Sequence, residues 1–176
     1  MLEAYMITFQ NSVEYTYIED DGRFPNNSRV PLLVYRSAVE VSGGNGARAF
    51  ETLFQQNRWE GSWRNGVYDV HHYHSTAHEV LGVYSGSARV QFGGESGTVC
   101  EVFAGDVVVI PAGVSHRRVS SNGDFRVVGA YPRGQRWDMN YGNEGERPQT
   151  DKNIASVPNP DADPVYGEKG PLKELW

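Results

Sequence analysis

The spacing of apolar residues changes at about Gly61 and again after Tyr131. Between these positions, short runs rich in Val, Tyr and Phe are broken by glycine-containing turns, as in NGVYDVHHYH, HEVLGVYSG, ARVQFGG, GTVCEVFAGD and VVVIPAG. Runs of strand length that recur every ~8–12 residues indicate an antiparallel sandwich or barrel. The pair Asn122-Gly123 is typical of a tight hairpin turn between two such strands. We therefore predict an all-β domain.

The segment before the barrel combines one extended piece with one helix. The apolar run RVPLLVYR follows the turn-rich DDGRFPNNS and predicts an edge strand or an arm laid over the domain. Farther along, Ala47, Phe50 and Phe54 share one helical face, and Asn45 stands where an N-cap belongs. This pattern predicts an amphipathic helix near residues 46–58, which is the one helix that we expect in the chain.

The segment after the barrel is rich in Pro, Gly, Asp and Asn, a composition that is often disordered at a terminus. Apolar residues nevertheless recur to its end, as in VYGEKGPLKELW. We therefore expect a tail that wraps around the barrel and docks on it. The expected single domain has three parts: an arm and helix at 1–60, a barrel core at 61–131 and a docked tail at 132–176.

Composition and charge narrow the class of partner. A chain of 176 residues is long enough for one domain with its own core. Apolar residues make up 39% and charged residues 22%, as in ordinary globular proteins. The net charge is -6 and the basic residues are scattered, so no footprint for nucleic acid or an anionic lipid surface is present. These features indicate a small-molecule partner.

Neither a membrane span nor a secretory signal is expected. The longest apolar runs are strand-sized, well below the ~20 residues of a spanning helix. The N-terminal MLEAYMITFQNS lacks the basic and apolar regions of a signal peptide. Cys100 is the single cysteine and has no partner for an internal disulfide. We expect a cytoplasmic protein.

Histidine is concentrated in one place. Four of the five histidines, His71, His72, His74 and His78, fall between positions 71 and 78. In a strand, residues i and i+2 point to the same face. His72 and His74 would therefore aim two imidazoles at one metal ion, while His71 and Tyr73 face the other way.

The next strand brings a carboxylate toward the same side. Glu79 shares its parity with Leu81 and Val83, so it points inward if those two apolar residues line the barrel. His78 then points outward. The fifth histidine, His116, follows the buried strand and corner of GDVVVIPAGVSH.

These positions match the two motifs of the cupin family. The first motif, which has two glycines, a His-x-His pair and a Glu at fixed spacing, is filled by Gly66, His72, His74, Glu79 and Gly86. The second is filled by Gly105, Pro111, Gly113 and His116, with Ser120 in place of the family's asparagine. The chain thus resembles a cupin. The stretches DDGRFPNN, GSWRNGV and DADPVYG and the final LW further resemble the YjlB-like subgroup of small single-domain cupins.

The resemblance implies a jelly-roll barrel that holds one divalent metal ion on three histidines and one glutamate. The family positions correspond to His72, His74, Glu79 and His116. This donor set suits Fe, Mn, Ni, Co, Cu or Zn and does not select among them. A shorter motif spacing would nominate His78 in place of Glu79, but strand parity favours Glu79. His71 and His78 are expected to be neighbours of the site.

Two further residues are candidates for substrate binding. Arg118 shares strand parity with His116 and would point into the barrel toward an anionic substrate, although a solvent-facing position fits the pattern equally well. Tyr68 precedes the histidine cluster, where it would either line the mouth of the barrel or pack against the helix.

Two hypotheses about function follow. The first is a metal-dependent enzyme, of the dioxygenase or isomerase/lyase type, that acts on a small polar or carboxylated metabolite. The second is a non-catalytic cupin that binds or senses a small molecule. The fold alone does not choose between them. The resemblance also implies a homodimer, which we expect to pair through the arm at 29–36.

Overall fold

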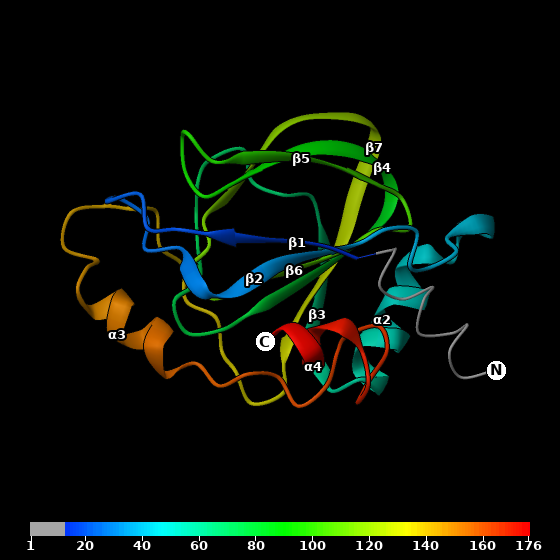
Figure 1. Ribbon diagram of the computed structural model, residues 1–176. Coiled ribbons are helices and arrows are strands. Elements are labelled where there is room, and N and C mark those ends of the chain that lie inside the picture. The colour runs from blue at the N-terminus through cyan, green and yellow to red at the C-terminus, as the bar shows by residue number, and fades with distance from the viewer. Residues whose placement is uncertain (1–12) are drawn as a thin grey trace.

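The computed structural model describes residues 13–176 and shows an antiparallel β barrel with short helices on its outside (Figure 1). The strands follow the order β1-β2-β6-β4-β7-β3, and β5 pairs with β4. Their bounds are Val13–Ile18 (β1), Asn27–Tyr35 (β2), Trp59–Asn65 (β3), Glu79–Phe92 (β4), Thr98–Phe103 (β5), Val107–Ile110 (β6) and His116–Pro132 (β7). The helical elements are Ser42–Gly44 (η1), Gly46–Gln56 (α2), Gln149–Ser156 (α3) and Pro171–Leu175 (α4). The predicted all-β class is confirmed.

The two long strands, β4 and β7, each pass from one layer of the barrel to the other. The first half of β4 lies between β6 and the end of β7, whereas its second half pairs with β5 and the start of β7. The bend in β4 lies at Gly86, which has a φ of 67°. A Cβ there would come within 2.7 Å of the Asn122 carbonyl oxygen, so the corner needs glycine.

The hairpin predicted at Asn122-Gly123 is wrong. Residues 116–132 form one continuous strand, and Asn122 pairs with Ser87 of β4. The pairing register between the two strands shifts on either side of Ser85, where the strands turn the corner together. The Asn-Gly pair therefore supplies the positive φ of a bent strand, 64° at Gly123, and not that of a chain reversal.

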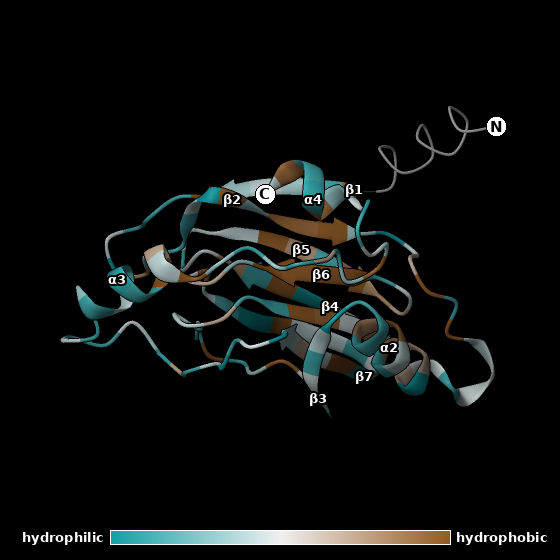
Figure 2. Ribbon diagram, turned by 90° about the horizontal axis from the view of Figure 1, so that it is seen from below, coloured by the Kyte–Doolittle hydropathy of each residue, from teal (hydrophilic) through white to brown (hydrophobic). Residues whose placement is uncertain are grey.

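One layer of the barrel contains β2, β6, the first half of β4 and the end of β7, and both of its faces are buried. This explains why its strands are continuous apolar runs. Alternate residues of β2, such as Leu32 and Leu33, belong to two different hydrophobic clusters, one inside the barrel and one on its outer face. Helix α2 covers the outer face, where the Phe50 ring occupies the space of a side chain at Gly82. Figure 2 shows the hydrophobic strands of this layer with α2 beside them.

In the N-terminal half, the structure differs from the sequence predictions in one strand and one loop and agrees with them in one helix. Strand β2 is not at an edge or in an arm, because it pairs with both β1 and β6. The run NGVYDVHHYH is not a strand: β3 ends at Asn65, and the segment that follows makes only isolated bridges before β4. Helix α2 agrees with the predicted helix, although the Asn45 side chain makes no capping hydrogen bond.

The tail contains two helices, α3 and α4, that the apolar pattern did not predict, because they have only eight and five residues. Asp163 is fully buried and accepts hydrogen bonds from the Tyr35 hydroxyl (2.6 Å) and from the backbone N–H of Leu172 (3.0 Å). Trp176 donates from its indole nitrogen to the Pro31 carbonyl (3.0 Å). These contacts hold the C-terminal residues on β2. Across residues 13–176, none of the helices has the length and hydrophobicity that a membrane span requires.

Candidate metal centre

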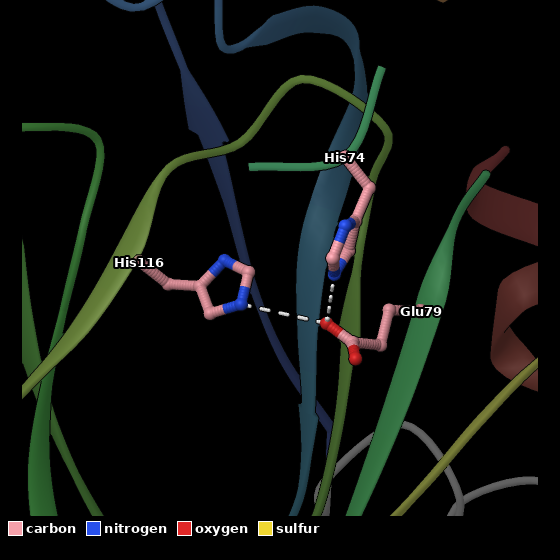
Figure 3. A group of neighbouring side chains, drawn as sticks. All are labelled: His74, Glu79 and His116. Carbon is pink, nitrogen blue, oxygen red and sulfur yellow. Dashed lines mark ion pairs between the residues drawn. The ribbon is translucent and has the colours of Figure 1, made fainter. Parts of the chain in front are cut away.

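Three potential metal ligands converge inside the barrel. The Nε2 atom of His74 lies 3.3 Å from Oε2 of Glu79, and Nε2 of His116 lies 3.4 Å from the same oxygen. The three ligand atoms all lie within 4.8 Å of one another, and all three side chains are buried. Figure 3 shows both imidazoles aimed at one oxygen of the carboxylate.

Backbone pairing brings these residues together from distant parts of the chain. Glu79 and His116 are the first residues of β4 and β7. His72 and His116 exchange two backbone hydrogen bonds (3.2 and 2.9 Å), and the His74 carbonyl accepts from the N–H of Gly113 (2.8 Å). A Cβ at Gly113 would come within 2.4 Å of the Asn26 carbonyl oxygen, so a larger residue would push the corner away from the site.

The orientation of each imidazole is fixed by a backbone carbonyl. In each of three histidines, Nδ1 faces a carbonyl oxygen: that of Val70 for His72 (2.9 Å), of Asp138 for His74 and of Val114 for His116 (3.1 Å). A carbonyl only accepts hydrogen bonds, so Nδ1 carries the proton in each ring. The Nε2 lone pairs remain available for a metal ion.

The centre therefore joins acceptor atoms that face one another. Oε2 of Glu79 is buried and has no hydrogen-bond partner. The neutral Nε2 atoms of His74 and His116 offer it only lone pairs, and such an arrangement is stable only with a cation or a proton between the atoms. This donor set, with its orphaned oxygen, fits a divalent metal ion.

Without a metal ion, the charges of the cluster depend on one another. Burial alone would raise the pKa of Glu79, but His74 and His116 lower it well below its ordinary value. Burial opposes a charge on His74, yet the adjacent Glu79 carboxylate raises the pKa of His74 above 6.5. A proton on His74 thus takes the place that a cation would occupy.

His72 lies beside this group and not within it. Its ring centroid is 4.2 Å from that of His116 and 6.1 Å from that of His74. Burial and the neighbouring His116 lower the pKa of His72 to about 3, so the ring stays neutral over most of the pH range. Three of the four ligands expected from the sequence therefore converge, and the fourth lies next to them.

A cavity of about 400 Å³ opens over the cluster. It is lined by Gly61, Trp63, Arg64, Asn65, Gly66, Val67, Tyr68, His72, His74, Glu79, Leu81, His116, Tyr131, Trp137 and Met139. Tyr68 is thus at the cavity, as one of the two sequence interpretations expected. Arg118 is absent from the lining, and its Nη1 lies 3.4 Å from the Ser121 hydroxyl on the strand surface.

Comparison with known proteins identifies the family. The family model described as "Cupin domain" matches residues 63–128. The uncharacterized protein YjlB of Bacillus subtilis (strain 168) is 42% identical over 160 residues, which cover 91% of this chain and 94% of that protein. The chain belongs to the cupin family. Its similarity to YjlB extends over nearly the whole length of both proteins.

Solved structures similar to this cupin include seed proteins. Pumpkin seed globulin is 26% identical, with 51% of this chain and 25% of that chain covered and a TM-score of 0.38. Coconut allergen cocosin is 17% identical, with 79% and 36% covered and a TM-score of 0.39. The cupin therefore spans between about a quarter and about a third of the length of these two structures.

Sequence reasoning missed a tyrosine that contacts the carboxylate. The Tyr131 hydroxyl donates to Oε1 of Glu79 (3.4 Å) and accepts from the indole N–H of Trp63 (2.9 Å). Burial and the Glu79 charge raise the pKa of Tyr131, so the hydroxyl remains a donor. Tyr131 lies at the end of β7, outside both motifs, and no sequence signal marks it.

The loop after β7 was also missed. It supplies Trp137 and Met139 to the cavity wall and the Asp138 carbonyl to His74. The Asp138 carboxylate in turn accepts hydrogen bonds from Ser75 and Asn140 and fixes the loop against the histidine segment. The sequence feature that could have identified this loop is the run RWDMN at residues 136–140, in a tail otherwise rich in Pro and Gly.

The other two histidines are buried on the far side of the histidine segment. His78 accepts a hydrogen bond at Nδ1 from the Ala112 N–H (2.9 Å), and its ring lies 4.6 Å from that of Trp176. His71 packs against Phe24. Neither lines the cavity, in keeping with positions that face away from the barrel interior, but both are covered by other parts of the chain.

Proposed function

We propose that this cupin holds one divalent first-row metal ion on His72, His74, Glu79 and His116 and binds a small oxygen-rich or carboxylated metabolite at that ion. The proposal rests above all on the meeting of Nε2 lone pairs with the orphaned Oε2 of Glu79. His72 joins the set because it is neutral, lines the same cavity and presents Nε2 away from its carbonyl partner.

The donor set suits Fe, Mn, Ni, Co, Cu or Zn. When bound, such an ion supplies Lewis acidity or redox chemistry, which corresponds to an isomerase/lyase or a dioxygenase. The residues of the chain add orientation and proton control. The Tyr131 hydroxyl, whose oxygen lies 3.4 Å from Oε1 of Glu79, carries a proton beside that carboxylate, and Leu81, Trp63 and Met139 restrict water at the cavity wall.

Non-catalytic binding is the second candidate function. A catalyst needs a polar group near the substrate in addition to its metal ligands. The Arg64 guanidinium at the cavity is already paired with Glu51 at 2.6 and 2.9 Å, and Arg118 lies elsewhere. Tyr131 is therefore the group on which catalysis depends in this proposal.

We place the protein in the cytoplasm, where its single free Cys100 would stay reduced, and we propose a homodimer. Residues 33–35 of β2 pair with both β1 and β6, so this part of the expected segment 29–36 has no free edge for a second copy. The end strand β1 is the better surface, since its Tyr15 and Tyr17 are 57% and 49% exposed. Sedimentation equilibrium should give twice the mass of the chain, and a monomer at all concentrations would contradict the dimer.

Metal analysis tests the central part of the proposal. Untagged protein purified without chelator should carry about one first-row metal ion per chain by mass spectrometry. His74→Ala should lose at least about nine-tenths of that metal. His71→Leu is the matched control, because it removes a buried histidine of the same segment that does not line the cavity. Wild type that is empty and cannot be loaded, or His74→Ala that is fully loaded, would overturn the proposal.

A further inference from the structure

Two aromatic rings stand at the rim of the cavity with half of their surface open. Tyr68 is 52% exposed and Trp137 is 51% exposed. Each contacts a different histidine of the site: Tyr68 lies 5.2 Å from the ring of His72, and Trp137 lies 5.7 Å from that of His74. Large exposed rings beside a concave polar centre are typical of a ligand-binding site.

The deeper wall continues this aromatic surface. Trp137 stacks on Tyr131 with 6.2 Å between ring centroids and 24° between planes. The indole of Trp63 fills the space of a side chain at Gly129, so that glycine makes room for the ring. The cavity therefore offers flat apolar faces from β3, β7 and the loops before β4 and after β7.

Several polar groups of the wall, its one guanidinium included, are already paired. Among the described residues that line the cavity, Arg64 is the one arginine and no lysine is present. Arg64 is bonded to Glu51, the Trp63 N–H to Tyr131 and Oδ1 of Asn65 to the N–H of Gly66 (2.8 Å). The wall thus offers an aliphatic carboxylate no free cation.

The metal cluster supplies the remaining recognition. A divalent ion with the single charge of Glu79 leaves one net positive charge, which favours an anionic oxygen ligand. Four protein ligand groups leave room on a first-row metal ion for two oxygens of one ligand. The cavity of about 400 Å³ is at the lower end of the roughly 300–1,000 Å³ of small-molecule sites.

We propose that the preferred ligands are planar aromatic compounds with two adjacent oxygen donors, as in a catechol, whose oxygens meet the metal ion while the ring lies against Trp137 and Tyr68. This inference rests on the proposed metal site and narrows its substrate class. It distinguishes this cavity from one that selects small aliphatic acids by charge.

The test uses the full chain loaded with Zn²⁺, which is redox-inert and leaves the probe intact. The probe is 4-nitrocatechol, followed by its visible absorbance and by tryptophan fluorescence, and oxalate is the aliphatic two-oxygen competitor. Wild type should bind 4-nitrocatechol about tenfold more tightly than oxalate because the ring buries apolar surface. Trp137→Ala should weaken 4-nitrocatechol by about fivefold and leave oxalate unchanged.

The control variant is Phe103→Ala, which removes an exposed aromatic ring at the end of β5 that does not line the cavity. It should bind both compounds as wild type does. Metal content, measured on each sample, separates the two ways to fail. A protein that takes up no Zn²⁺ overturns the metal site and this inference together. A loaded protein that binds oxalate as tightly as 4-nitrocatechol, or whose Trp137→Ala variant binds both unchanged, overturns the aromatic preference alone.

Discussion

At the residue scale, the chemistry of the site depends on which imidazole nitrogen carries a proton. Strand parity predicted that Glu79 points inward, whereas the full set of His72, His74, Glu79 and His116 came from the resemblance to cupins; the structure brings His74, Glu79 and His116 together. The partners of Nδ1 were beyond such reasoning. The acceptor for His74 is the Asp138 carbonyl, 64 residues later in the chain, and only the folded structure brings it there.

Tyr131→Phe tests whether the hydrogen bond from Tyr131 to Glu79 contributes to metal affinity. The change removes the hydroxyl that donates to Oε1 of Glu79 while keeping the ring that stacks on Trp137. Loss of such an outer hydrogen bond should weaken metal affinity by about tenfold, as measured by competition with a chromophoric chelator. Tyr68→Phe is the control, since no hydrogen bond from its hydroxyl to Glu79 is seen in the described chain. Equal affinity in Tyr131→Phe and wild type would show that Tyr131 does not position Glu79.

At the element scale, the sequence predicted elements that have a strong apolar pattern of their own. It missed features that depend on which strands pair with one another. Helix α2 has an apolar face of full length, so its pattern identified it. Strand β2 looked like an edge because a sequence run does not reveal which strands pair with it. The Asn122-Gly123 pair does contain the positive φ that the sequence suggested, at Gly123. This φ belongs to a bend in β7, because the neighbouring β4 bends at Gly86 in the same place.

Asp163→Ala tests the attachment of the tail to β2. The carboxylate is buried and accepts from the Tyr35 hydroxyl and from the N–H groups of Val165 and Leu172. Its loss leaves buried donors without acceptors and should lower the free energy of unfolding by about 3 kcal/mol in urea titrations. The control is Asp161→Ala, which removes an ion pair with Arg133 at the surface. This change should alter the free energy of unfolding by less than about 0.5 kcal/mol. Similar losses in both variants would contradict the attachment.

At the scale of the whole molecule, buried histidines couple stability to pH. Burial lowers the pKa of His72 and of His78 to about 3. In the unfolded chain these groups take up protons near their ordinary value of 6.5, whereas the folded protein does not, so acid favours unfolding between these values. The raised pKa of His74 acts in the opposite sense. The stability that His74 contributes is fully present below pH 6.5 and is lost as the pH rises through the pKa of His74 in the folded protein.

The metal-free chain should therefore be most stable near the ordinary pKa of histidine. Between about pH 6 and pH 5, before most carboxylates titrate, the free energy of unfolding should fall by about 1.4 kcal/mol per pH unit for each of His72 and His78. Urea unfolding in the presence of chelator measures this slope. A stability that stays constant or increases over that interval would show that these histidines are not held neutral in the folded protein.

The central claim is that the Nε2 atoms of three histidines and the free oxygen of Glu79 hold one metal ion. X-ray diffraction from a crystal of the metal-loaded protein, recorded on both sides of the absorption edge of that metal, locates the ion directly. The account predicts a single anomalous peak per chain, placed among Nε2 of His72, His74 and His116 and Oε2 of Glu79. A peak at His71 or His78, or no peak inside the barrel of loaded protein, would contradict it.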